Sequence, residues 1–210
     1  MSAQGADTVR STPAILSEAG LDRLVAMLAA DGYRVIGPRL EAAGVTLGPI
    51  ERAGDLAFGV VDAQAPGRYR AETQGAAGML APAAPATPWK RFLYPPDERL
   101  FAARRSGDGF DIEAVEPVCD EPPLALFAIR PCDLAAVGVL DAVLANARTA
   151  DRRYRARRAR TFVVAADCAR AGGTCFCASM GTGPKAVGGF DLILSEVPEG
   201  RRILVAAGSE

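Results

Sequence analysis

The stretch that decides the fold is LALFAIRPCD, residues 124–133, in which six consecutive apolar residues lead into Arg-Pro-Cys-Asp. A second apolar run with a similar ending, TFVVAADC, occupies residues 161–168. Continuous apolar runs of this length are typical of strands that are buried on both faces of a parallel sheet. We therefore predict buried strands over 124–129 and 161–166, each followed at once by a cysteine-bearing turn.

Helical patterns lie on either side of these runs. Apolar residues at helical spacing predict a helix within 14–31 and another over 134–144, with Asp133 as the N-cap of the second. Residues 53–96 include a stretch rich in Gly, Ala and Pro. There we predict a long irregular segment with one short strand at 56–61, which wraps a surface or covers a site.

Strand pairs complete the predicted architecture. They are expected at 33–38 with 45–50, at 98–104 with 110–116 across a Ser-Gly-Asp-Gly turn, and at 191–197 with 202–206. The sequence therefore predicts one α/β domain over residues 1–210. It consists of a mixed sheet with flanking helices and a cysteine-rich loop at the strand ends.

Composition excludes several classes of protein. Half of the 210 residues are hydrophobic and 23% are charged, which excludes an intrinsically disordered chain. Lys plus Arg number 24 against 25 for Asp plus Glu, a balance with no bulk attraction to nucleic acid or to a membrane surface. The polar opening segment lacks a signal-peptide core, and no apolar run reaches the ~20 residues of a membrane span. We expect a cytoplasmic protein.

The cysteines point to thiolate chemistry. Histidine is absent, which excludes histidine acid–base catalysis and every histidine-containing metal site. Parallel strands end at the same edge of a sheet, so we expect Cys132 and Cys168 to meet there, joined by Cys175 and Cys177 from a glycine-rich loop. Four thiolates suit a tetrahedral zinc ion or an iron–sulfur cluster. On spacing alone, redox-active thiols and incidental cysteines remain alternatives. Cys119 stands apart, and we interpret it as a non-ligand.

Three further patterns are interpreted structurally. Residues 181–186 match the dinucleotide fingerprint G-x-G-x-x-A, but a cysteine loop precedes them where a strand is required, so we expect a loop that shapes the pocket. Six arginines between 152 and 160 predict a solvated helical face, with docking to an acidic partner or to nucleic acid as alternatives. The aromatic residues of 89–94 are expected in the core or at an interface. No pair of carboxylates with acid–base spacing is identifiable.

Five motifs, in this order, resemble a single family. The chain is similar, from about residue 20 to about residue 197, to the β subunit of soluble sulfhydrogenases (NAD(P)-linked nickel–iron hydrogenases), a family that includes the A subunit of anaerobic sulfite reductase. The motifs are GYRVIGP (32–38), PGRYR (66–70), WKRFLYPP (89–96), IRPCDL (129–134) and TCFCASMGTGP (174–184).

The resemblance implies a non-catalytic electron-transfer subunit. Cys132, Cys168, Cys175 and Cys177 would hold one [4Fe-4S] cluster. Electrons would pass between a flavin/NAD(P)H-binding subunit and a catalytic metal-centre subunit of a hydrogenase or a sulfite/sulfur reductase complex.

One feature departs from the family. Its members usually continue into a ferredoxin-like region with two C-x₂-C-x₂-C-x₃-C-P runs, and this chain ends at Glu210 without them. We therefore expect a truncated form, a fragment or a split subunit, with a separate ferredoxin-like protein as a further partner. A non-redox zinc-binding scaffold with four cysteine ligands is the alternative function. A thiol–disulfide protein using Cys175 and Cys177 ranks third.

Overall fold

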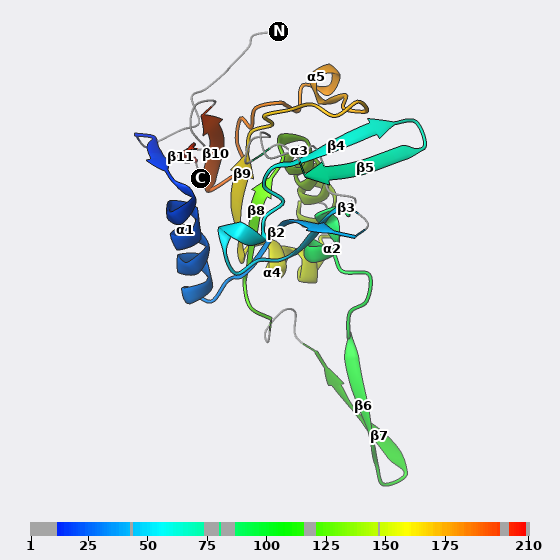
Figure 1. Ribbon diagram of the computed structural model, residues 1–210. Coiled ribbons are helices and arrows are strands. Elements are labelled where there is room, and N and C mark those ends of the chain that lie inside the picture. Colours follow the sequence, from blue (N-terminus) through cyan, green and yellow to red (C-terminus); the bar gives the residue numbers. More distant parts are fainter. Residues whose placement is uncertain are drawn as a thin grey trace.

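The structure is a computed structural model that describes residues 12–42, 44–73, 80, 87–115, 121–146, 148–197 and 202–208. The chain folds into a seven-stranded mixed sheet with helices packed against it, which confirms the predicted α/β class (Figure 1). In spatial order its strands are β1 (Ala14–Leu16), β11 (Arg202–Ala207), β10 (Leu192–Val197), β9 (Thr161–Ala166), β8 (Leu124–Ile129), β2 (Arg34–Glu41) and β3 (Gly44–Pro49).

The centre of the sheet is parallel. Strands β10, β9, β8 and β2 all run in one direction, whereas β3, β11 and β1 pair antiparallel at the edges. All six residues of β8 are buried, as predicted for a strand that is covered on both faces. Because β8 and β9 are parallel neighbours, their carboxyl ends share one edge of the sheet. The turns that carry Cys132 and Cys168 begin at that edge.

Helices cover both faces of the sheet. On one face, α1 (Glu18–Ala30) buries Leu21, Val25 and Leu28 against a cluster that includes Phe127 of β8. On the other face lie α2 (Lys90–Leu93), α3 (Pro131–Leu140) and α4 (Arg152–Arg158), with Leu126 of β8 in their cluster. The alternation of Leu126 and Phe127 between two cores explains why β8 contains no polar residue. None of the helices in the described part of the chain has the length and apolarity that crossing a bilayer requires.

The helical predictions are confirmed in part and corrected at both N-termini. Helix α1 begins at Glu18, capped by the Ser17 hydroxyl, and the preceding residues form β1. Asp133 is not the N-cap of α3. Arg130 is the N-cap and Pro131 takes the first helical position, where the missing N–H leaves no hydrogen bond unmade. Cys132 therefore lies in the first turn of α3.

The prediction of irregular structure over 53–96 is wrong for part of that segment. Besides the 3₁₀ turn Ala53–Asp55 and α2, it contains a hairpin of β4 (Val60–Ala65) and β5 (Arg68–Thr73), where a strand at 56–61 is predicted. The hairpin lies against the cysteine-bearing loop. The hydroxyl of Thr174 donates to the amide oxygen of Gln64, and a Cβ on Gly173 would stand 2.5 Å from the Gln64 carbonyl. The hairpin thus covers part of the cysteine-bearing loop.

A second hairpin, β6 (Phe101–Ser106) with β7 (Gly109–Ala114), confirms the predicted turn at Ser-Gly-Asp-Gly. It projects away from the sheet and helices (Figure 1). The closing pair β10 and β11 is likewise antiparallel, as predicted.

Candidate metal centre

The turns after β8 and β9 bring four cysteines to one edge of the sheet. Cys132 stands in the first turn of α3, and Cys168 follows the end of β9 by two residues. Cys175 and Cys177 belong to the connection from β9 to β10, with Cys177 opening the single turn α5 (Cys177–Met180). All four are free thiols. Cys132 and Cys175 are exposed, and the other two are half-buried. Cys119 lies outside the described residues.

A β-bulge at the end of β8 directs the chain toward this edge. The register between β8 and β9 shifts between Phe127 and Ile129, and Ala128 between them has φ = 61°. A non-glycine residue in this left-handed region costs about 1–2 kcal/mol, and it persists only where its surroundings hold it. Bulges bend a strand and re-aim the side chains that follow. Here those side chains are Arg130 and Cys132.

Arg130 is a buried cation between the two cysteine turns. Its guanidinium donates to the backbone carbonyl of Asp167 at 3.0 Å and to that of Leu80 at 2.6 Å. The side chain also interacts with the thiol of Cys168, on which its positive charge acts to lower the pKa. One side chain thus links the end of β8, the end of β9 and the covering segment.

Asp167 fastens the second cysteine turn. Its carboxylate accepts hydrogen bonds from the Ala186 N–H at 3.0 Å and from the Ser195 hydroxyl at 2.8 Å. Its neighbour Cys168 donates its N–H to the Pro184 carbonyl at 3.0 Å. The returning loop is thereby held against the end of β9, where Cys168 emerges.

Backbone contacts close the loop around Cys177 and Cys175. The Thr182 N–H donates to the carbonyl of Cys177 at 2.9 Å, and the Gly172 N–H donates to the sulfur of Cys175 at 3.2 Å. Gly183 lies so close that a Cβ there would stand 3.2 Å from the Cys177 sulfur and 3.6 Å from Pro131. This packing sets Cys177 beside the first turn of α3, and therefore beside Cys132.

The thiols influence one another electrostatically. Although Cys132 is exposed as a residue, partial desolvation of its thiol raises its pKa to about 11, and the charges of Asp133, Cys168 and Cys177 add to that shift. Burial also raises the pKa of Cys168, with further contributions from Cys177 and Cys175 that Arg130 opposes. Groups act on each other's pKa in this way only when they share a neighbourhood. Thiolates crowded together repel, and a bound metal relieves that repulsion by stabilising the deprotonated form.

The arrangement is looser than a site for a single ion. Within the described ranges, no three of the cysteine and carboxylate side chains gather closely enough to coordinate one metal ion. The donor set itself is four thiols from two strand ends and one loop, with an N–H···S bond already present at Cys175. Such a set fits the thiolate ligation and the N–H···S bonds of an iron–sulfur cluster.

The chain matches no protein-family model, no curated protein and no solved structure. The resemblance to the sulfhydrogenase β-subunit family therefore stays a prediction that rests on the sequence motifs. Independent support for the site comes from its own geometry.

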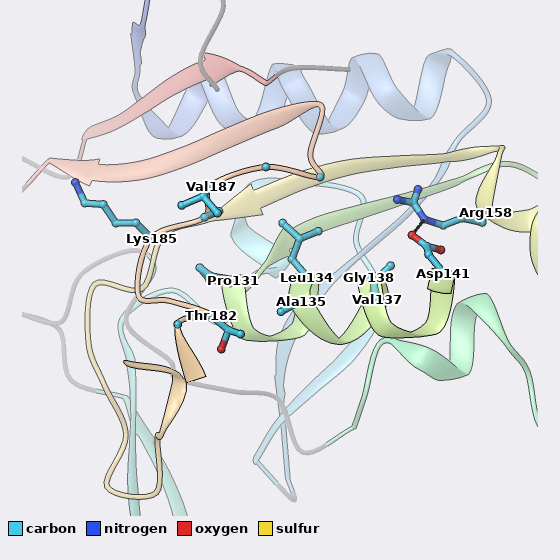
Figure 2. Close-up of a pocket in the computed structure, with 14 residues that line it drawn as sticks. Pro131, Leu134, Ala135, Val137, Gly138, Asp141, Arg158, Thr182, Lys185 and Val187 are labelled. Carbon is cyan, nitrogen blue, oxygen red and sulfur yellow. Dashed lines mark hydrogen bonds and ion pairs between the residues drawn. The ribbon is translucent and has the colours of Figure 1, made fainter. Parts of the chain in front are cut away.

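An apolar groove of ≈ 250 Å³ begins at Pro131, the residue before Cys132 (Figure 2). It runs between α3 and the loop 181–189, from Pro131 beside Cys132 toward the ion pair of Arg158 with Asp141, whose Nε and Oδ2 atoms are 3.1 Å apart. The match to the dinucleotide fingerprint lies in this loop. Gly181 there follows the turn α5, and the described chain after it forms no helix before β10. The loop lines this groove, and its role in shaping a cluster pocket stays a prediction.

Two other sequence interpretations are resolved by burial. Trp89 and Phe92 are core residues, whereas Tyr94 is exposed. The prediction of a solvated face for the arginine run is wrong for Arg157, whose side chain is only 4% exposed. Arg155 on the same helix is exposed, as predicted.

Sequence reasoning missed Arg130 and Asp167 as parts of the site. Arg130 lies two residues before Cys132, and Asp167 lies directly before Cys168. Their closeness to the cysteines in sequence is the signal from which their role could have been predicted. A charged residue at the end of a buried apolar run needs a partner when it is buried itself. Here the arginine of one strand end partners the backbone of the other.

Proposed function

We propose that this chain is an iron–sulfur electron-transfer subunit that holds one [4Fe-4S] cluster through Cys132, Cys168, Cys175 and Cys177. It would relay electrons between a flavin/NAD(P)H-binding subunit and the catalytic metal subunit of a cytoplasmic hydrogenase or sulfite/sulfur reductase complex. The observation that supports the proposal is that the cysteine-bearing turns after two adjacent parallel strands begin at the same edge of the sheet. The family resemblance supplies the identity of the complex.

The protein's own groups suit the ligation of a cluster. When bound, the cluster supplies one-electron transfer through valence changes of its iron. Cys132 in the first turn of α3 lies at the positive end of the helix dipole, which stabilises a thiolate. The Gly172 N–H bonds the sulfur of Cys175, and Arg130 places a buried positive charge beside Cys168. Each of these contacts stabilises negative charge on sulfur. Because reduction adds negative charge to the cluster, the same contacts raise its reduction potential.

The position of the site also suits a relay. Cys132 and Cys175 are exposed. Phe176, between the two loop cysteines, and Met180, three residues after Cys177, are exposed as well. Exposed apolar side chains around a redox group provide a surface on which an electron-transfer partner can pack. The apolar groove beside α3 extends this surface (Figure 2).

The test is anaerobic purification of the full chain, followed by analysis of iron, sulfide and zinc and by absorption spectra before and after dithionite. We expect roughly four irons and four sulfides per chain, with a brown absorption band that bleaches on reduction. Stoichiometric zinc without colour, from protein expressed in iron-supplemented medium, would support the four-cysteine zinc scaffold instead. Neither metal, with a reversible disulfide between Cys175 and Cys177, would support the thiol–disulfide alternative.

Single alanine variants then test the ligand set. Alanine at Cys132, Cys168, Cys175 or Cys177 is expected to lower bound iron by at least half. Cys119→Ala is the matched control and should keep the iron content of the parent chain. Full iron retention in Cys168→Ala would overturn the assignment.

A further inference from the structure

The β6–β7 hairpin is a ribbon that stands outside the body of the protein (Figure 1). Every residue of both strands is exposed, and in the described part of the chain the two strands pair only with each other. An isolated two-stranded ribbon is at best marginally stable in water, because it lacks a covered hydrophobic face. A projecting ribbon of this kind therefore needs support at its base, a cover for its apolar face, or both.

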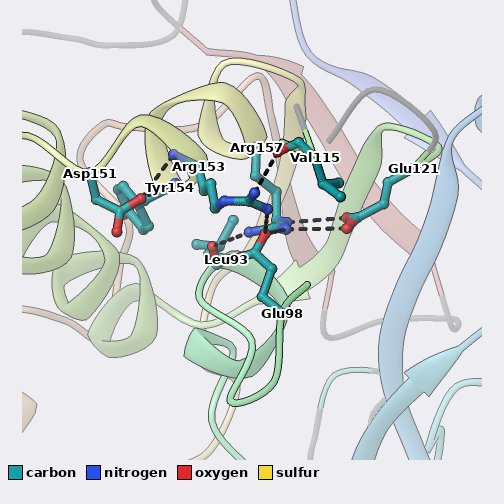
Figure 3. A network of polar contacts seen from close by, with 8 residues as sticks. All are labelled: Leu93, Glu98, Val115, Glu121, Asp151, Arg153, Tyr154 and Arg157. Atoms are coloured by element: carbon teal, nitrogen blue, oxygen red, sulfur yellow. Dashed lines mark hydrogen bonds and ion pairs between the residues drawn. The ribbon is translucent and has the colours of Figure 1, made fainter. Parts of the chain in front are cut away.

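The base of the ribbon is held by two arginines of α4, the half-buried Arg153 and the buried Arg157 (Figure 3). Arg153 donates to the carbonyl of Val115 at 2.6 Å and pairs with Glu98 at 3.3 Å. Arg157 pairs with the same carboxylate of Glu98 at 2.8 Å. Glu98 precedes β6 and Val115 follows β7, so α4 holds both ends of the ribbon. The arginine run thus fixes where the ribbon leaves the body.

The ribbon has one apolar and one polar face. Residues directly opposite each other in an antiparallel pair lie on the same face. The pairs on the apolar face are Phe101–Ala114, Ala103–Ile112 and Arg105–Phe110, and those on the polar face are Ala102–Glu113, Arg104–Asp111 and Ser106–Gly109. The three large apolar side chains, Phe101, Phe110 and Ile112, are 61%, 70% and 72% exposed. An apolar face this bare is unusual on a protein surface and marks an interaction site.

The charge of the ribbon favours a second copy as the occupant. Residues 98–115 contain three arginines and four acidic residues, so two ribbons do not repel each other strongly. A ribbon with a strong net charge would instead indicate a partner of opposite charge. The only charge on the apolar face is Arg105, next to the tip.

We propose that two copies of the chain associate through the apolar faces of their β6–β7 ribbons. In a two-fold arrangement with the ribbons antiparallel, Phe110 near one tip meets Phe101 near the base of the other ribbon, and Ala103 lies at the centre. Arg105 of each copy then reaches the Phe101 ring of the other, a favourable cation–π contact. Two ribbons stacked about 10 Å apart form a four-stranded sandwich with its own small core.

The area available predicts a weak dimer. A fully buried aromatic side chain removes roughly 150–250 Å² from water, so the two phenylalanines and Ile112 of each copy give about 1,000 Å² in total. This is the lower limit for a specific interface. We therefore expect a dissociation constant in the micromolar range.

Sedimentation velocity of the full chain tests the proposal, at concentrations up to about 100 µM so that a micromolar dimer is populated. A thiol reductant prevents disulfides between exposed cysteines from mimicking a dimer. We expect the mass to rise from monomer to dimer with concentration. Ile112→Lys on the apolar face should raise the dissociation constant at least tenfold. Its neighbour Glu113→Lys, on the polar face, should leave the constant within about twofold.

Two outcomes would overturn the proposal. One is a monomer at the highest concentration. The other is a dimer that Ile112→Lys does not weaken more than Glu113→Lys. Both positions are exposed on the projecting ribbon, so neither variant disturbs the body of the protein, which circular dichroism would verify. The result does not depend on the cluster, because the ribbon contains no cysteine ligand.

Discussion

The guanidinium of Arg130 donates to the carbonyl of Asp167 at 3.0 Å, which ties the residue two positions before Cys132 to the residue directly before Cys168. The same guanidinium reaches the Leu80 carbonyl, and Arg130 as a whole is only 5% exposed. Two cysteine turns whose cysteines have 35 residues between them in sequence are therefore set relative to each other by one buried side chain. The spacing of the thiols depends on this link.

Arg130→Met is expected to destabilise the protein by roughly 3 kcal/mol. It leaves the carbonyls of Asp167 and Leu80 without a donor, and each buried unsatisfied group costs about 1–3 kcal/mol. Urea unfolding of the metal-free chain measures the loss. In the loaded protein, loss of the positive charge near Cys168 should also move the midpoint potential negative, by on the order of tens of millivolts.

Arg170→Met is the matched control for that prediction. Arg170 lies two residues after Cys168, but it is exposed. Its removal should change the free energy of unfolding by less than about 0.5 kcal/mol. Equal destabilisation by the two variants would show that Arg130 does not link the turns.

Gly183→Ala should reduce iron content without unfolding the chain. A Cβ at Gly183 would stand 3.2 Å from the Cys177 sulfur and 3.4 Å from its Cβ, so the Cys177 side chain must shift by a few tenths of an ångström. Iron and sulfide analysis after reconstitution measures the effect. The control is Gly138→Ala in α3, where a Cβ meets nothing within 4 Å and alanine favours the helix by about 1 kcal/mol. If Gly183→Ala loads iron as fully as Gly138→Ala, Cys177 is not a ligand.

Local pattern was sufficient to predict the elements that position the site. The strands β8 and β9 were predictable because their runs of six and five consecutive apolar residues are typical of strands that are buried on both faces. Their parallel pairing then places Cys132 and Cys168 at one edge, which is a rule of topology rather than of composition. By contrast, β1 is three residues long and exists only because it pairs with β11, almost two hundred residues later. No local signal carries such a pairing.

The burial of individual charges was not predictable in the same way. Arg157 belongs to a run that looks like a solvated face, but it lies one helical turn after Tyr154, and both face the core. Arg157 can be buried there because Glu98 and Glu121, from distant segments of the chain, pair with its guanidinium. Arg130 is similar, since its acceptors are backbone carbonyls that no sequence pattern reveals.

The thiol of Cys132 should alkylate slowly in the metal-free, reduced protein. Its pKa is raised to about 11, chiefly by burial, so at pH 8 only a small fraction is thiolate, the reactive form. Relative to an ordinary cysteine with a pKa of about 8.5, we expect a rate lower by about two orders of magnitude. Because the folded state holds this proton more tightly, stability should also fall as pH rises from about 8.5 toward 11.

Peptide mapping by mass spectrometry, after pulses of iodoacetamide between pH 7 and 10, measures the alkylation rate of Cys132 itself. The rate should still be rising at pH 10. A rate that levels off near pH 9 would show that the thiol is not held protonated by its surroundings.

Arg157→Met should cost about 1–3 kcal/mol in the free energy of unfolding. The guanidinium pairs with Glu98 at 2.8 Å and Glu121 at 3.2 Å and donates to the Leu93 carbonyl at 3.2 Å. Its removal leaves the Leu93 carbonyl without this donor and Glu98 partly uncompensated, whereas Glu121 is exposed enough to be solvated. Arg155→Met on the exposed side of α4 is the control, with an expected change below about 0.5 kcal/mol.

The same variant should loosen the β6–β7 ribbon. Glu98 would then keep only its longer contact with Arg153, at 3.3 Å, so one anchor of the ribbon is weakened while the sheet stays intact. Limited proteolysis at the ribbon's arginines, followed by mass spectrometry, should therefore be faster in Arg157→Met than in Arg155→Met under conditions where both are folded. Equal cleavage rates combined with a large loss of stability would show that Arg157 stabilises the folded body but does not anchor the ribbon. Faster cleavage would show that this buried pair also sets the rigidity of a surface element.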